Sequence, residues 1–234
     1  MSITDHRKQH FCRIPFEKIE ILAGGEVFLC CPGWLRKPIG NLNETPLLEL
    51  WKNGVAQEIR QSMYDGTFQF CDDSLCPHLQ ALDTGAPPAI YSPIENREHP
   101  RSSYIETLIS GIEGSVPNGP REIVVGFDLT CNLSCPSCRR EPVVYRPGMA
   151  AWQQADKMAG ELIGAYPMLR RLKIAGNGDP FASRIYGRML NALDAEKYPN
   201  LFVTLHTNGL LFTPDRWKEL QKGQASIDTV EVSV

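Results

Sequence analysis

The segment CNLSCPSCRR, residues 131–140, contains three cysteines, Cys131, Cys135 and Cys138. Closed structural metal sites use four protein ligands, whereas a metal that activates a small molecule keeps a coordination position open. Three thiolates at this spacing can hold three corners of a cubane iron–sulfur cluster and leave the fourth iron without a protein ligand. The segment therefore predicts an open cluster whose fourth iron binds a cofactor or substrate. A zinc site that borrows a fourth ligand, or three unliganded thiols, are the alternatives.

The chain has eight cysteines, and five of them lie within the first 80 residues. The N-terminus lacks an apolar leader segment and no apolar run is long enough to span a membrane, so we expect a cytoplasmic protein with no membrane partner. Cysteines in a reducing compartment indicate metal binding or catalysis rather than disulfides. The net charge of −3 and the absence of a basic block argue against a nucleic-acid partner. Arg139 and Arg140 are expected at solvated positions or beside local anionic groups.

Strands and helices are expected to alternate from residue 122 onwards. Continuous apolar runs predict buried strands, and apolar residues at helical spacing predict the helices between them. Ser183 and Thr213 are expected to cap two of these helices. Regular alternation of this kind predicts a parallel sheet with right-handed crossovers. The expected strands are IVVGFDL, RRLKIAG, LFVTLHT and DTVEVSV, and the expected helices lie near residues 150–166, 183–193 and 213–223.

Each expected strand runs into a polar or glycine-rich stretch. The first strand leads to Cys131, the second to GNGDP (residues 176–180), the third to TNG (207–209), and the fourth contains Ser233. Because the carboxyl ends of parallel strands share one edge of the sheet, these four stretches are expected around one site.

This set of motifs resembles the radical S-adenosylmethionine (radical SAM) superfamily over residues 122–234. The resemblance implies a parallel-stranded partial TIM-type barrel in which Cys131, Cys135 and Cys138 ligate a [4Fe-4S] cluster. It also implies that SAM chelates the open iron and that an electron from the cluster cleaves SAM to a 5′-deoxyadenosyl radical, which abstracts hydrogen from a substrate. Two residues depart from the family pattern: Ser137 replaces an aromatic residue and Asp179 a glutamate. The positions implied to bind the cofactor are Gly176, Asn177, Gly178, Asp179, Thr207, Asn208 and Ser233, and no catalytic residue is implied beyond the cluster ligands.

The N-terminal cysteines resemble the SPASM/twitch module of radical SAM enzymes in a shortened form. The resemblance rests on Cys12, Gly25 and Cys30, on Gly40-Asn41 before a Trp51-containing helix, and on a C-x4-C pair at positions 71 and 76. It implies an auxiliary [4Fe-4S] cluster held by Cys12, Cys30, Cys71 and Cys76. Cys31 is an alternative to Cys30, since neighbours on a strand point to opposite faces. A zinc ribbon made from the same four cysteines is the other interpretation.

We therefore expect an auxiliary module at residues 1–80, a Pro- and Gly-rich linker at 81–121 with a helix near 104–112, and a radical SAM core at 122–234. The chain ends inside the fourth strand, which leads us to expect a truncated barrel or a fragment of a longer enzyme. By the resemblance, the partners are SAM, a reductant such as flavodoxin or ferredoxin, and a peptide or small-molecule substrate. The alternative function is a non-catalytic iron–sulfur or zinc module for binding or electron transfer, because a fold does not fix a function.

Overall fold

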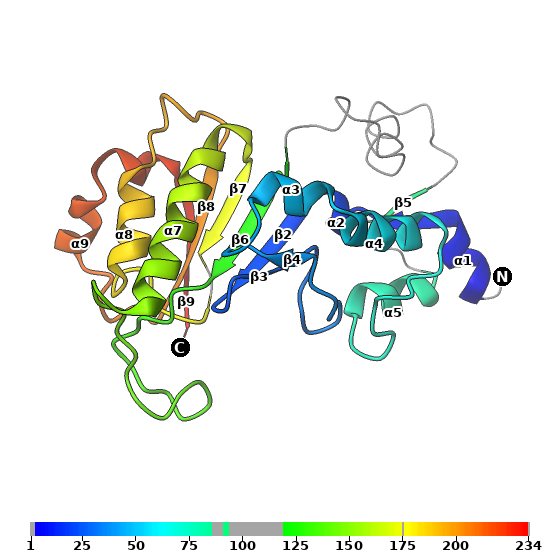
Figure 1. Cartoon of the computed structure of the whole chain (residues 1–234), viewed down its shortest axis with the longest axis horizontal. Coiled ribbons are helices and arrows are strands. Elements are labelled where there is room, and N and C mark those ends of the chain that lie inside the picture. Colours follow the sequence, from blue (N-terminus) through cyan, green and yellow to red (C-terminus); the bar gives the residue numbers. More distant parts are fainter. Residues whose placement is uncertain (1–2, 86–90, 94–118, 175, 234) are drawn as a thin grey trace. The chain divides into compact units, whose positions relative to one another are not determined.

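The computed structural model describes residues 3–85, 91–93, 119–174 and 176–233 (Figure 1). Contacts divide the chain into two compact units, the first formed by residues 1–20, 27–40 and 47–120 and the second by 21–26, 41–46 and 121–234. The helix expected near 104–112 falls outside the described residues. Among the described residues, no helix has the length and apolar character needed to cross a membrane.

Within the described residues, the strands form one open seven-stranded sheet and a separate two-stranded sheet. The order in the large sheet is β4-β3-β2-β6-β7-β8-β9, and the small sheet pairs β1 with β5. The strands β6–β9 pair as consecutive parallel neighbours, which confirms the parallel arrangement expected from the alternation of strands and helices. The sheet is not closed.

The first unit is built from short elements around an apolar core. Asn53 ends one helix and caps the next, since its side chain accepts a hydrogen bond from the backbone N–H of Ala56 at 2.9 Å. The strand expected to contain Cys30 and Cys31 ends earlier, at Phe28, so both cysteines follow it. The elements in the first 93 residues are α1 (Ile3–Gln9), β1 (His10–Cys12), α2 (Ile14–Glu17), β2 (Lys18–Leu22), β3 (Glu26–Phe28), β4 (Gly40–Asn41), α3 (Leu47–Lys52), α4 (Gly54–Tyr64), α5 (Pro77–Asp83) and β5 (Tyr91–Pro93).

The second unit alternates strands and helices as the sequence predicts. Ser183 and Thr213 cap α8 and α9 with their side chains, as expected. The elements are β6 (Glu122–Gly126), α7 (Ala150–Ala165), β7 (Arg171–Ile174), α8 (Arg184–Asn191), β8 (Phe202–Thr207), α9 (Pro214–Glu219) and β9 (Ile227–Val232), with short 3-10 turns at Tyr166–Met168 and Gln221–Ser226.

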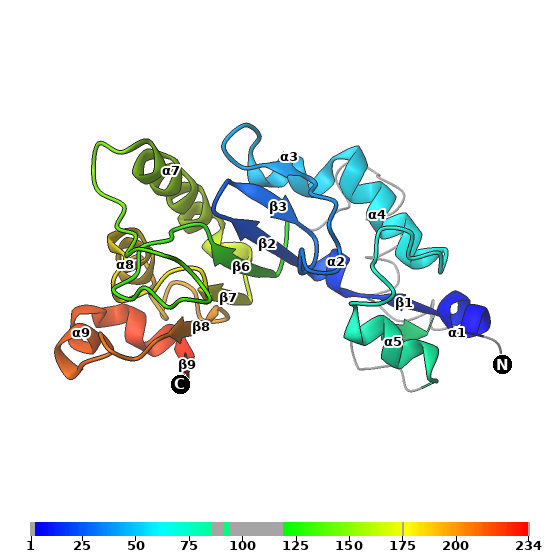
Figure 2. The ribbon, with the colours of Figure 1, turned by 90° about the horizontal axis from the view of Figure 1, so that it is seen from below.

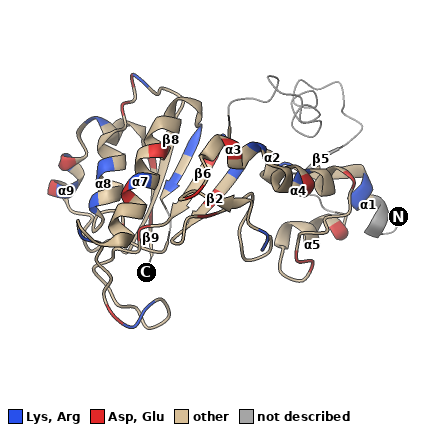
Figure 3. Ribbon diagram, in the orientation of Figure 1, with Lys and Arg blue, Asp and Glu red and all other residues tan. Residues whose placement is uncertain are grey.

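The helices α7, α8 and α9 lie on one face of the strands β6–β9 (Figure 2). Apolar side chains on this face of the sheet, among them Ile123, Leu172 and Val203, are fully buried. Lys173 and His206 alternate with buried neighbours and are only partly buried. The continuous run IVVGFDL was expected to form a buried strand, but burial alternates over residues 122–125 of β6 because helices pack on a single face, and it alternates in β7 as well. Basic and acidic side chains are interspersed along the described ribbon (Figure 3).

Candidate functional site

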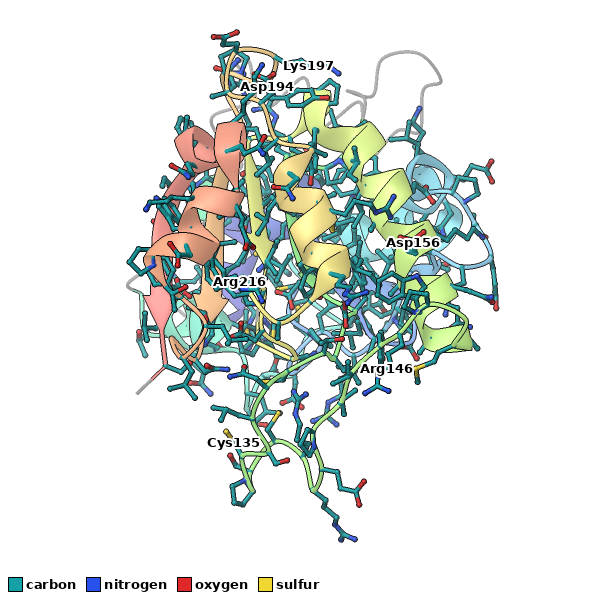
Figure 4. The ribbon with its side chains drawn as sticks, turned by 90° about the vertical axis from the view of Figure 1, so that its left-hand side faces the viewer. Cys135, Arg146, Asp156, Asp194, Lys197 and Arg216 are labelled. Atoms are coloured by element: carbon teal, nitrogen blue, oxygen red, sulfur yellow. The ribbon has the colours of Figure 1, made fainter. Side chains whose placement is uncertain are left out.

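The loop that follows β6 carries the three motif cysteines. Its start is anchored by the backbone N–H of Cys131, which donates to the carbonyl of Val143 at 2.9 Å. A turn then brings the N–H of Cys138 within 2.8 Å of the carbonyl of Cys135. Cys131 is partly buried, whereas Cys135 and Cys138 are exposed. Figure 4 shows Cys135 on the part of the loop that extends away from the strands, so the loop presents thiols to solvent at the carboxyl edge of the sheet.

The carboxylate of Asp179 joins two of the other predicted loops. Asp179 is 1% exposed. Its Oδ2 accepts hydrogen bonds from Thr207 Oγ1 at 2.7 Å and from the backbone N–H of Asn208 at 3.0 Å. Its Oδ1 accepts from the N–H of Phe181 at 2.9 Å, and its own N–H donates to the carbonyl of Thr130. The side chain predicted to contact the cofactor is therefore buried and binds the loops around the site.

Asn208 connects the TNG loop to the cysteine loop. Its Nδ2 donates to Asn132 Oδ1 at 3.0 Å and lies 3.7 Å from the sulfur of Cys131. On the other side, the N–H of Ser233 donates to the carbonyl of Thr207 at 2.9 Å. Contacts thus run from Cys131 through the TNG loop to Ser233. Three of the four strand ends that the sequence predicts around one site are linked in this way, and Asp179 adds the remaining one.

Gly178 is required by the close approach of two backbone segments. A Cβ atom at this position would lie 2.3 Å from the carbonyl oxygen of Asp128 and 2.7 Å from that of Thr130. Gly176 has a φ of 52°, in the left-handed region that glycine adopts most easily. Gly176 and Asn177 are exposed, so their backbone groups lie at the surface beside the buried Asp179.

Ser233 is exposed and belongs to a polar chain on β8 and β9. Its Oγ lies 2.6 Å from His206 Nε2, and the other ring nitrogen of His206 lies 3.2 Å from Glu231 Oε2. Lys173 Nζ contacts the same carboxylate at 2.7 Å and lowers the pKa of Glu231. These side chains lie on the sheet face opposite the helices.

Two residues at the site have structural roles that the sequence reasoning missed. Asp128 is fully buried; its Oδ1 accepts from the N–H of Thr130 and its Oδ2 from Ser183 Oγ at 2.5 Å. An acidic residue inside the apolar run that precedes the cysteines was the available signal. Arg139 was expected at a solvated position or beside an anionic group, and in the structure its guanidinium contacts two backbone carbonyls and the sulfur of Cys138.

In the first unit, four cysteines from three separate segments line one apolar pocket. They are Cys12, Cys30, Cys71 and Cys76, and the same pocket is lined by Trp34 and Met63 among others. Cys31 is not among the lining residues. Cys12, Cys30 and Cys76 are buried, and Cys71 is partly buried. The thiols named from the sequence as an auxiliary ligand set therefore face a common space.

Burial raises the pKa of each of these thiols. It raises the pKa of Cys30 to about 11 and that of Cys71 to about 12. The pKa of Cys12 is raised well above its ordinary value, first by burial and then by the charge of Cys30. Two N–H groups face the sulfurs: Trp34 Nε1 donates to Cys30 at 3.2 Å and the N–H of Leu79 to Cys76 at 3.4 Å. Hydrogen bonds to sulfur and the low polarity of the surroundings tune clusters held by cysteines, so this donor set suits such a group.

Over the described part of the chain, no three His, Cys, Asp or Glu side chains are arranged to hold a metal ion. The 131–138 loop and the four-cysteine pocket each supply thiol groups, which are the ligands that iron–sulfur clusters use. At the exposed loop the donors are three thiols with N–H groups from Asn208 and Arg139 directed at two of them.

Comparison with known proteins gives two kinds of match. Residues 12–77 match the SPASM family, described as an iron–sulfur cluster-binding domain, and this range contains all four cysteines of the pocket. The chain is also 32% identical over 112 residues to the FeMo cofactor biosynthesis protein NifB of Methanocaldococcus jannaschii and 29% identical to that of Methanocaldococcus infernus. Each match covers 44% of this chain and 36% of the relative, so the chain spans about a third of the relatives' length. No solved structure matches. With the cysteine loop and the parallel sheet described above, these matches support a radical SAM protein that carries a SPASM iron–sulfur module.

Proposed function

We propose that this protein is a radical SAM enzyme that cleaves S-adenosylmethionine reductively at a [4Fe-4S] cluster held by Cys131, Cys135 and Cys138. When bound, the cluster supplies one electron that splits SAM into methionine and a 5′-deoxyadenosyl radical, and the radical takes a hydrogen atom from the substrate. We further propose that β6–β9 are part of the partial barrel in which such reactions take place.

The observation that carries this proposal is the contact between Asn208 and Cys131. Asn208 Nδ2 lies 3.7 Å from the sulfur, and the backbone of Asn208 is held by the buried carboxylate of Asp179. The loops after β7 and β8 are therefore tied together beside a loop that offers three thiols. Cofactor binding at the carboxyl ends of parallel strands needs this kind of convergence.

Some residues of this chain would hold the cluster, and others would bind and orient SAM. The three thiols would hold the cluster, and the exposed backbone of Gly176 offers polar groups to the amino-acid part of SAM, beside Asn177, whose carbonyl is held by Arg139. Ser233, exposed and held by His206, offers a hydroxyl for the ribose. Asp179 stays inside the protein and fixes the loop positions.

For the first unit we propose a second [4Fe-4S] cluster on Cys12, Cys30, Cys71 and Cys76. Its support is the shared pocket and the two N–H donors directed at Cys30 and Cys76. Four thiolates leave no coordination position open, which suits electron transfer or structural stabilisation better than substrate activation. Zinc on the same four thiols is the competing assignment.

For the substrate we propose a peptide or a small polar molecule, and for the reductant a flavodoxin or ferredoxin. The support for a polar substrate is the sheet face that carries Lys173, His206 and Glu231, where charged groups stay partly exposed. The two similar NifB proteins are named for the biosynthesis of the FeMo cofactor.

The test is anaerobic reconstitution with iron and sulfide, followed by reduction in the presence of SAM. Two cubane clusters give about eight irons per chain, and replacing Cys131, Cys135 and Cys138 together with alanine should remove about four of them. The reconstituted protein should form 5′-deoxyadenosine, detected by chromatography and mass spectrometry, and the triple variant should form none.

Two results would count against this function in different ways. Stoichiometric zinc with no iron would remove the basis for radical chemistry altogether. Two clusters with no 5′-deoxyadenosine would favour the second candidate, a non-catalytic iron–sulfur module for electron transfer, which the closed four-cysteine pocket alone would support.

A further inference from the structure

Arg139 lies directly after the third motif cysteine and makes three side-chain contacts. Its Nη1 donates to the carbonyl of Leu129 at 2.5 Å. Its Nη2 donates to the carbonyl of Asn177 and lies 3.3 Å from the sulfur of Cys138. The backbone N–H of Arg139 donates to the carbonyl of Cys135 at 2.9 Å, which closes the turn between the second and third cysteines.

Through these contacts Arg139 connects the cysteine loop after β6 with the loop after β7. Leu129 precedes the first cysteine, Cys138 is the third, and Asn177 belongs to the loop after β7. The two carbonyls fix the plane of the guanidinium, since its N–H groups form a rigid planar fork. A surface arginine without such acceptors would sample many rotamers, whereas this one is directed at a single sulfur.

We propose that Arg139 is a positioning residue that holds the Cys138 thiolate in place and raises the reduction potential of the cluster bound there. A charge-assisted N–H contact stabilises negative charge on sulfur. Reduction adds one negative charge to the cluster, so a fixed cation beside a ligand stabilises the reduced form more than the oxidised form. Hydrogen bonds to the ligating sulfurs are an established means by which proteins set cluster potentials.

The stabilisation of negative charge by neighbouring N–H groups differs between the sulfurs of this loop. Cys131 faces the neutral amide of Asn208 at 3.7 Å, while Cys138 faces a full positive charge at 3.3 Å. Arg140, the next residue, has the same charge and is exposed. It therefore serves as a charge-matched control one position farther along the chain.

The inference rests on the proposed function, because it requires a cluster at Cys131, Cys135 and Cys138. The experiment uses the full chain, reconstituted with both clusters, and compares wild type with Arg139→Gln, Arg139→Lys and Arg140→Gln. The potential of each cluster is measured by reductive titration followed by electron paramagnetic resonance. The signal that changes when SAM is added identifies the cluster of the 131–138 loop, and the other signal is an internal reference.

We expect Arg139→Gln to shift the potential of the SAM-responsive cluster to more negative values and to leave the reference cluster unchanged. Arg139→Lys should shift it less in the same direction, because the charge remains while the planar fork is lost. Arg140→Gln should shift neither signal. Loss of iron from this site alone in Arg139→Gln would support the positioning role, and Arg139→Lys would then report the effect on the potential.

An unchanged potential in both Arg139 variants, with wild-type iron content, would overturn the inference. An equal shift in Arg140→Gln would also overturn it, since net charge rather than the specific contact would then be responsible. Failure of the proposed function can be distinguished from failure of this inference. If the proposed function is wrong, the wild-type protein itself shows no iron on the 131–138 loop and no signal that responds to SAM.

Discussion

Asp179 Oδ2 accepts a hydrogen bond from the backbone N–H of Asn208 at 3.0 Å, so the loop after β7 positions the loop after β8. The same oxygen accepts from Thr207 Oγ1 at 2.7 Å. Asn208 in turn directs its amide at the sulfur of Cys131. A buried carboxylate thus acts on the cysteine loop through one intermediate residue, which makes Asp179 a positioning residue for the proposed cluster and cofactor.

The first prediction concerns this carboxylate. Asp179→Ala should leave the donors of Thr207, Asn208 and Phe181 without their acceptor and lower the free energy of unfolding by about 1–3 kcal/mol, the usual cost of an unsatisfied buried group. We expect SAM affinity of the reconstituted protein to fall as well. Asp179→Asn keeps one acceptor oxygen and should fall between wild type and alanine. Urea unfolding and equilibrium SAM binding measure the two effects, and wild-type values for Asp179→Ala would contradict the role assigned here.

The second prediction compares two glycines. Gly178→Ala would place a methyl group against the carbonyls of Asp128 and Thr130, and we expect it to cost about 1–3 kcal/mol as overpacking does. Gly164→Ala, in the exposed side of α7 with nothing within 4 Å of the added carbon, should instead stabilise the protein by about 0.5–1 kcal/mol. Denaturant unfolding of the two variants tests both signs. An unchanged free energy of unfolding in Gly178→Ala would mean that the loop at Gly178 can move away from the carbonyls of Asp128 and Thr130 at little cost.

The third prediction follows from the raised pKa values of the pocket thiols. In the folded metal-free protein the pKa of Cys30 is about 11 and that of Cys71 about 12, against an ordinary value of 9.0. Above pH 9 the unfolded chain loses these protons before the folded protein does, so the unfolded state binds fewer protons and stability must fall as pH rises. Below pH 9 the contribution is complete, and it disappears as pH rises through the folded values.

The measurement is denaturant unfolding of the reduced, metal-free protein between pH 8 and 11, where a falling free energy of unfolding is expected. Replacing Cys30 and Cys71 together with serine should make this dependence shallower, because two of the four pocket thiols with raised pKa values are removed. A slope as steep as that of the wild type in the double variant would assign the alkaline instability to other groups. Iron loading should also flatten it, since metal-bound thiolates have already released their protons.

The fourth prediction concerns Trp34, whose Nε1 lies 3.2 Å from the sulfur of Cys30. Trp34→Phe keeps an aromatic ring in the pocket and removes the N–H donor. We expect the potential of the N-terminal cluster to become more negative, since a hydrogen bond to a ligating sulfur stabilises the reduced form. The SAM-responsive cluster provides the reference and should keep its potential. Zinc in the first unit, or no cluster signal from it, would contradict the assignment of an auxiliary cluster. An unchanged potential of that cluster in Trp34→Phe would contradict the role of the Trp34 N–H.

Much of the local structure could be predicted because it depends on neighbours in the chain. Ser183 and Thr213, the two predicted caps, each accept a hydrogen bond from the backbone N–H three residues ahead, and such contacts are set by a few consecutive residues. The parallel order of β6–β9 follows similarly from short crossovers through single helices. The addition of β2, β3 and β4 to this sheet was not predicted, because a pairing across about a hundred residues leaves no local pattern.

The sequence by itself determined which residues offer thiols, the alternation of strands and helices from residue 122 onwards, and therefore which edge of the sheet carries the cysteine loop. Tertiary structure decided how those residues divide their roles. It buried Asp179 as a bridge between loops, left Gly176 and Asn177 at the surface, directed Arg139 at Cys138 and chose Cys30 over Cys31 to line the pocket. The reason is physical: residue types and spacing set what groups are available, but burial and hydrogen-bond partners depend on segments that are distant in sequence and meet only when the chain folds.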